Sequence, residues 1–235
     1  MGKNSNGKND KKAEKYERIL DAAVRVFAKK GFYQSRVSDI AREAGVADGT
    51  IYLYFKNKDD ILISIFEEKM RTAISYFQQK ISQEESALFK LKRFVRVHLE
   101  LFKNNPELAA VLQVELRQSS RFMKEYKKVE LKRFLDLIGD IVKQGQEEGV
   151  FRKDIPVSLV KRFVFGALDE VISTWVSSGG RFELIDYADP LSDLFIRGLG
   201  TARVFEEVMH SESGGDSEHT SHNSQEGGQN YEAYR

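Results

Sequence analysis

The sequence predicts an all-α protein with a small three-helix N-terminal domain and a larger C-terminal helical domain, about nine helices in all. Apolar residues recur at intervals of three and four along most of the 235-residue chain. Only three prolines interrupt this pattern, and 41% of the residues are apolar, which is enough to fill two cores. The chain has no cysteine, so disulfides and thiolate metal sites are excluded.

Composition divides the chain into four parts. We expect a disordered N-terminal tail, a small helical domain, a larger helical domain and a disordered acidic tail, spanning residues 1–14, 15–60, 61–208 and 209–235 respectively. The first 60 residues carry 13 Lys+Arg against 9 Asp+Glu, whereas residues 204–235 carry one Arg against seven acids. A basic N-terminal domain favours a polyanionic partner. We expect no cofactor and no metal site, because the histidines of the acidic tail have no predicted ordered neighbours.

The first helix is expected from Tyr16 to Lys30, where apolar residues follow helical spacing. Gly31 should end it in a left-handed turn, with Phe32 packing back onto Phe27. The stretch from Val37 to Phe55 then predicts two more short helices around a tight corner at Gly45, where a residue with a Cβ would be strained. This arrangement is typical of a helix-turn-helix, whose second helix offers its outer face to the DNA major groove.

The outer face of that second helix carries small and hydrogen-bonding residues, namely Asp48, Gly49, Thr50, Tyr52 and Tyr54. A glycine inside a helix costs about 1 kcal/mol relative to alanine, so close approach to a partner would explain Gly49. The alternative is an ordinary helical hairpin with a tyrosine-rich surface.

The run GVADGTIYLYFKNKDDIL, residues 45–62, resembles the TetR family of bacterial transcription regulators. The resemblance implies that Thr50, Tyr52, Tyr54 and Lys58 contact operator DNA, and that Ser38 begins the first helix of the motif. The family often has Ser or Thr where this chain has Ala47, so we expect Asp48 to cap the second helix instead. The predicted DNA-binding residues are Ser38, Asp48, Gly49, Thr50, Tyr52, Tyr54 and Lys58, with the tyrosines and the lysine on phosphates.

A long helix should connect the two domains. Asn57 is its expected N-cap, acidic residues fill its first turn, and apolar spacing continues to Ile81. Ser82 with Glu85 resembles a capping box that opens the next helix. His98 falls on the apolar stripe of that helix, so we expect it to be a hydrogen-bonded core residue rather than a ligand. Asn105 and Pro106 restart the chain, since proline at the first helical position loses no hydrogen bond.

The last two long helices, expected at residues 156–177 and 184–205, follow a helix at residues 122–144 and are apolar nearly all round. Such helices must be covered on more than one side. We therefore expect a homodimer in which these two helices form a four-helix bundle with their symmetry mates. A twofold dimer calls for a palindromic DNA operator.

The second domain is larger than dimerisation requires, so we expect it to hold a small-molecule effector. Two segments, QVELRQS (residues 113–119) and FGALDEVISTWV (residues 165–176), resemble the fatty-acid-degradation repressors of the TetR family. The resemblance covers residues 15 to about 200 and implies long-chain acyl-CoA as the effector. The expected effector-binding residues are Gln113, Arg117, Gln118, Asp169 and Trp175. Alternatively, Arg117 pairs with Glu115, Asp169 or Glu170 to fix the helix packing.

Two other classes of protein are possible from the sequence, namely a regulator with a different effector and an all-helical enzyme. A regulator that responds to a drug or another hydrophobic cation would use an aromatic pocket with one or two acids. An enzyme is disfavoured, because the chain lacks cysteine, an HExxH motif, a GxSxG motif and a glycine-rich phosphate loop. No apolar run reaches the roughly 20 residues of a membrane span, and no signal peptide is evident. We therefore expect a soluble cytoplasmic regulator without membrane contact.

Overall fold

The computed structural model describes residues 6–115, 129–202 and 204. Within these ranges the chain forms nine α-helices and no strand beyond one isolated bridge between Phe151 and Gly200, which confirms the predicted all-α class. The elements are α1 Asn6–Lys30, α2 Val37–Glu43, α3 Asp48–Ile51, α4 Lys58–Ile81, α5 Ala87–Lys103, α6 Pro106–Ala110, the π-helix η1 Val111–Glu115, α9 Val129–Glu147, α10 Val157–Ser177, the 3₁₀-helix η2 Leu184–Tyr187 and α11 Ala188–Leu199. None of the described helices is long and apolar enough to cross a bilayer.

The helices α1, α2 and α3 pack around one small core together with the first turns of α4. Gly31 ends α1 with a φ of +77°, and the rings of Phe27 and Phe32 meet edge to face at 5.4 Å, as predicted. The helix begins at Asn6, so residues 6–14 are helical and the expectation of a disordered tail over them is wrong. The additional turns continue the polar end of α1 away from the domain core.

The helix-turn-helix forms around Gly45, whose φ of +63° confirms the predicted left-handed corner. The helix α3 is shorter than expected, since it contains only four residues and continues from Tyr52 as a turn. The expected capping role of Asp48 is also wrong. Ala47 occupies the N-cap with an extended backbone and no side-chain bond, which places Asp48 at the first helical position. There its carboxylate lies in the first turn, where the helix dipole favours an acid.

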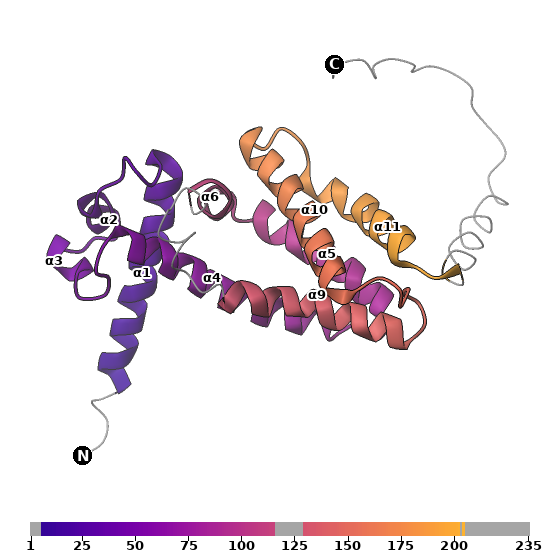
Figure 1. The fold of residues 1–235 in the computed structure, drawn as a ribbon. Helices are drawn as coiled ribbons and strands as arrows, with labels where there is room; N and C mark the ends of the chain where they lie inside the picture. Colours follow the sequence, from indigo (N-terminus) through magenta and orange to yellow (C-terminus); the bar gives the residue numbers. More distant parts are fainter. Residues whose placement is uncertain (1–5, 116–128, 203, 205–235) are drawn as a thin grey trace, which may run out of the picture.

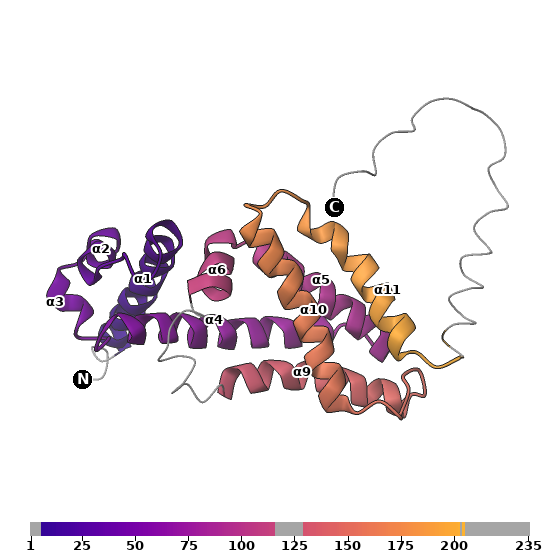
Figure 2. The same ribbon diagram turned by 45° about the horizontal axis from the view of Figure 1, so that its top comes forward.

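The helix α4 joins the two domains (Figure 2). Asn57 caps it as predicted, since its side-chain oxygen accepts a hydrogen bond from the Asp60 amide at 2.9 Å. Its first half is buried in the N-terminal core and its second half in the C-terminal core. The predicted capping box at Ser82 is wrong, because Ser82 ends α4 and Ser86 caps α5. The connection uses the second of two serines that both suit a helix N-terminus.

The core of the larger domain is built around α5, which packs against the second half of α4 and against α9, α10 and α11. One side of α10 and one side of α11 face this core. Their other sides leave Leu159, Phe163 and Leu194 exposed by 56%, 56% and 65%. We call these three residues the outer α10–α11 face. The rings of Phe163 and Phe195 meet at 5.7 Å, so the two helices are in contact beneath it.

Candidate DNA-binding surface and internal pocket

The helix α3 lies at the outer edge of the small domain (Figure 1). Asp48 and Gly49 are exposed, Thr50 is half-buried, and the Tyr52 ring is 59% exposed. No atom lies within 4 Å of the position that a Cβ at Gly49 would occupy. The fold itself therefore does not require glycine there, and close approach of DNA to Gly49 stays a prediction.

Two further predicted DNA-binding residues are less accessible. Ser38 is the second residue of α2 and is half-buried. The half-buried Tyr54 packs its ring against Tyr16, with ring centres 6.1 Å apart. Leu53 and Tyr33, which were not among the predicted DNA-binding residues, are also exposed, by 79% and 64%. No sequence signal marks Leu53, because single exposed apolar residues are common on protein surfaces.

Lys58 makes contacts within the fold. Its ammonium donates hydrogen bonds to the carbonyl oxygens of Phe32, Ser35 and Tyr33 at 2.5, 2.9 and 3.2 Å. It also lies 4.5 Å from the centre of the Phe32 ring. Burial lowers the pKa of Lys58, and the nearby Asp59 carboxylate opposes that shift. Lys58 thus joins the start of α4 to the turn between α1 and α2, and its contact with DNA phosphate stays a prediction.

The variants Tyr52→Ala and Lys58→Met separate the two roles. Because the Tyr52 ring is exposed, we expect its loss to weaken DNA binding about tenfold for all sequences, as loss of a phosphate contact would, without changing the melting temperature.

Lys58→Met should instead lower the stability by about 1–3 kcal/mol, since three carbonyls lose a charged donor. Scanning calorimetry and fluorescence anisotropy with DNA measure both effects. An unchanged melting temperature for Lys58→Met would assign that lysine to DNA alone.

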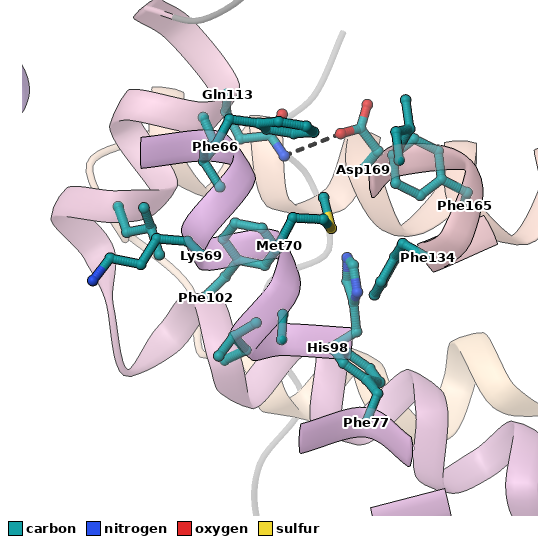
Figure 3. Close-up of a pocket in the computed structure, with 15 residues that line it drawn as sticks. Phe66, Lys69, Met70, Phe77, His98, Phe102, Gln113, Phe134, Phe165 and Asp169 are labelled. Carbon is teal, nitrogen blue, oxygen red and sulfur yellow. Dashed lines mark hydrogen bonds between the residues drawn. The ribbon is translucent and has the colours of Figure 1, made fainter. Parts of the chain in front are cut away.

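The larger domain contains a cavity of about 420 Å³ between α4, α5, α9 and α10, and residues of α6 and η1 also line it. Apolar and aromatic side chains form most of its wall, and four polar residues complete it (Figure 3). The polar residues are Lys69, His98, Gln113 and Asp169. Within the described part of the chain, no group of three His, Cys, Asp or Glu residues could hold a metal ion. The cavity therefore suits an organic molecule that is largely apolar.

The structure brings two of the predicted effector-binding residues together. The Gln113 side-chain amide on η1 donates to the Asp169 carboxylate on α10 at 3.0 Å, and both line the cavity. Trp175 does not line this cavity, and its role in effector binding stays a prediction. Its indole N–H donates to the carbonyl of Phe182 at 3.1 Å, which holds the ring at the end of α10 and outside the cavity wall. Arg117 and Gln118 lie outside the described residues.

Sequence patterns do not distinguish most of the cavity wall from a filled core. The residues concerned include Phe66, Met70, Ala73, Phe77, Phe102 and Phe134. Their helical spacing is the same whether the apolar face meets another side chain or an empty space. Gln113 and Asp169 were predicted to bind an effector, whereas His98, also a polar residue on an apolar stripe, was predicted only to be part of the core.

His98 lies on the floor of the cavity with 5% of its surface exposed. The rings of Phe77, Phe94, Phe102 and Phe134 surround it at 5.3–5.9 Å between centres. Its burial was predicted correctly, but the expected hydrogen bond was not found, since Nδ1 has no partner among the described residues. Burial lowers the pKa of His98 from 6.5 to about 4, against a smaller opposing effect of Asp169. The imidazole is therefore neutral at pH 7.

Replacement of His98 by leucine should make the protein less sensitive to acid. The wild-type imidazole stays neutral in the folded state while the unfolded state takes up a proton below pH 6.5. Stability is therefore full above that pH and falls by up to about 3 kcal/mol as the pH drops to about 4. His98→Leu removes this loss, which urea unfolding at pH 7 and pH 5 would detect. Equal losses in the wild type and the variant would contradict the buried, neutral imidazole.

Each of the two domains matches a known protein family. Residues 19–65 match the family described as bacterial regulatory proteins, tetR family, and residues 66–198 match the family described as YsiA-like protein, C-terminal region. The chain is 40% identical over 188 residues to the fatty acid metabolism regulator protein of Bacillus subtilis, which covers 80% of this chain and 97% of that one.

Two solved structures share the same fold and similar sequence. A crystal structure of the Bacillus subtilis transcriptional regulator FadR in complex with stearoyl-CoA is 40% identical, with a TM-score of 0.75, covering 78% of this chain and 98% of that one. The fatty acid degradation regulator FadR from Bacillus halodurans is 39% identical, also with a TM-score of 0.75, covering 77% and 94% of the respective chains.

Proposed function

The chain belongs to the TetR family of bacterial regulatory proteins, and from this we propose that it represses fatty-acid-degradation genes until long-chain acyl-CoA releases it from its operator. The family assignment confirms the resemblance of residues 45–62. The close relatives are transcription regulators rather than enzymes. The observation that carries the choice of effector is the apolar cavity beside α4, in a chain similar to a regulator that binds stearoyl-CoA.

The cavity wall suits an acyl chain because aromatic and aliphatic side chains make up most of it. Phe66, Met70 and Ala73 supply it from α4, and Phe134 and Phe165 from α9 and α10. Each methylene group that leaves water for such a wall contributes about 0.8 kcal/mol. Affinity should therefore rise with chain length until the cavity is full. A shorter or more polar molecule would leave part of the wall empty.

A homodimer through the outer α10–α11 face completes the proposal. Leu159, Phe163 and Leu194 form an apolar surface on two adjacent helices, and burial against a symmetry mate would remove it from water. Two copies of α3 would then face DNA together, which requires a palindromic operator. The dimer would have one form that fits DNA well and another that fits it poorly. Repression ends if acyl-CoA binds the second form more tightly than the first.

Acyl-CoA binding by the free protein tests this proposal. We expect isothermal titration calorimetry to show one stearoyl-CoA per chain, weaker binding of octanoyl-CoA, and no binding of CoA alone. Native mass spectrometry of the purified protein should detect copurified CoA thioesters. Equal affinity for all chain lengths, or no binding at all, would overturn acyl-CoA as the effector.

A hydrophobic cation is the second candidate effector, because the Asp169 carboxylate lies in the aromatic cavity wall. Its bond with Gln113 would have to be replaced by contacts with the cation. The same calorimetry with a lipophilic quaternary ammonium compound discriminates between the two. Binding of the cation without binding of stearoyl-CoA would favour a regulator that responds to drugs.

A further inference from the structure

The segment from Leu108 to Glu115, at the junction of α6 and η1, belongs to both domains. Leu108 and Leu112 line the cavity and also pack against the N-terminal core. Val111 is fully buried in that N-terminal core. One face of this segment therefore touches whatever fills the cavity, and another touches the domain that carries α3.

Glu115 ends this segment and reaches the DNA-binding domain directly. Its Oε2 accepts a hydrogen bond from the backbone N–H of Phe32 at 2.6 Å, across 83 positions of sequence. Its Oε1 lies 3.5 Å from the position of a Cβ on Gly31. The half-buried carboxylate thus rests on the turn that ends α1. A hydrogen bond to a carboxylate is about twice as strong as one between neutral groups.

The turn that Glu115 holds is also held by Lys58. The Phe32 amide donates to Glu115 while the Phe32 carbonyl accepts from the Lys58 ammonium. The Ser35 hydroxyl closes the turn by donating to the Gly31 carbonyl at 2.6 Å. Two residues after Ser35, α2 begins and leads through Gly45 into α3. The position of this turn therefore sets the position of the helix-turn-helix.

The π-helix η1 contains both a residue of the cavity wall and the residue that contacts the α1–α2 turn. Gln113, which bonds Asp169 across the cavity, lies two residues before Glu115 in η1. A π-helical turn is rare and is often found at functional sites. A ligand that displaced Gln113 and Leu112 together with their backbone would shift η1 and therefore Glu115.

We propose that Glu115 is the positioning residue that passes occupancy of the cavity to the helix-turn-helix through its hydrogen bond with the Phe32 amide. This inference rests on the proposed function. A ligand in the cavity shifts η1, the carboxylate withdraws from or reorients the α1–α2 turn, and α2 and α3 follow the turn. The effect is reciprocal, so bound DNA weakens ligand binding by the same factor.

The variants Glu115→Ala and Glu115→Gln test the inference in the full-length protein. Operator affinity is measured by fluorescence anisotropy with and without stearoyl-CoA, and stearoyl-CoA affinity is measured separately on the free protein. For the wild type, the operator affinity without stearoyl-CoA should be at least about tenfold higher than the affinity with it, and this ratio lies within the usual range of allosteric coupling. We expect Glu115→Ala to reduce that ratio to about twofold or less while the affinity for stearoyl-CoA changes less than about threefold.

Two controls keep the outcome specific. Glu115→Gln retains an acceptor oxygen without the charge, so it should restore part of the ratio that the alanine variant loses. Glu107→Ala removes an exposed carboxylate from α6 and should leave the ratio unchanged. A wild-type ratio in Glu115→Ala overturns the inference and leaves the proposed function standing. If the wild type itself ignores stearoyl-CoA, the proposed function fails and the inference fails with it.

Discussion

Replacing Leu194 with glutamate is expected to yield a monomer that has lost high-affinity binding to its operator. The Leu194 side chain is 65% exposed on α11, whose Phe195 ring contacts Phe163 of α10, and we propose that Leu194 and Phe163 are both buried in the dimer. A carboxylate at this position would have to lose its hydration at the centre of an apolar interface. Around a twofold axis it would also face its own copy, so two like charges would be buried together.

The loss of dimerisation should carry over to DNA, because one copy of α3 reaches only one half-site. Two linked half-sites bind more tightly than either alone by a factor of about 10² to 10⁴. We expect at least a hundredfold weaker operator binding at ~0.15 M salt, within that range. Analytical ultracentrifugation gives the oligomeric state and fluorescence anisotropy gives the affinity.

Phe89→Glu is the matched control, since Phe89 is a similarly exposed apolar residue on α5. It should change neither the oligomeric state nor the affinity for DNA. A Leu194→Glu variant that remains a dimer at micromolar concentration would place the interface elsewhere on the molecule.

Filling the cavity by Ala73→Phe is expected to produce a repressor that acyl-CoA no longer releases. Ala73 lies on α4 with 8% of its surface exposed, and its methyl group forms part of the cavity wall. A phenyl ring at this position would occupy space that the acyl chain needs. If three or four methylene groups are excluded, at about 0.8 kcal/mol each, the affinity for stearoyl-CoA falls about a hundredfold.

The same variant should retain the fold and the affinity for DNA. Filling an apolar cavity commonly adds about 0.5–2 kcal/mol of stability, so the melting temperature should hold or rise. Thr72→Phe, which adds the same ring on the exposed side of α4, should leave the affinity for stearoyl-CoA unchanged. Normal release of the Ala73→Phe protein by stearoyl-CoA would show that the effector binds outside this cavity.

Local signals in the sequence predicted most of the fold. Gly31, Gly45 and Asn57 end or begin helices where expected, because each solves a problem of backbone geometry or hydrogen bonding within a few residues. The errors were also local. Ser82 and Ser86 are both good N-caps, and only the packing of α4 decides that the second one is used. The early end of α3 after Ile51 had no sequence signal, since Tyr52 and Tyr54 are compatible with a helix.

The candidate sites were harder to predict, because they depend on distant residues. The hydrogen bond from the Phe32 amide to Glu115 joins positions far apart in the chain, and nothing local marks either partner. Helical spacing also cannot show whether an apolar face meets a neighbour or a cavity, so nothing in the sequence marks Ala73 and Phe77 as cavity residues. Lys58 was assigned to DNA from the resemblance alone, whereas the structure shows that it also holds three carbonyls of its own chain.

Titration of the complex between the full-length protein and operator DNA with stearoyl-CoA tests the central claim most directly. Fragments from upstream of fatty-acid-degradation genes would be compared with unrelated DNA by fluorescence anisotropy at several salt concentrations. We predict sequence-selective binding that weakens steeply with salt, and release by about one equivalent of stearoyl-CoA per chain but not by CoA. Binding that is equal for all DNA, or a selective complex that stearoyl-CoA leaves intact, would contradict the account.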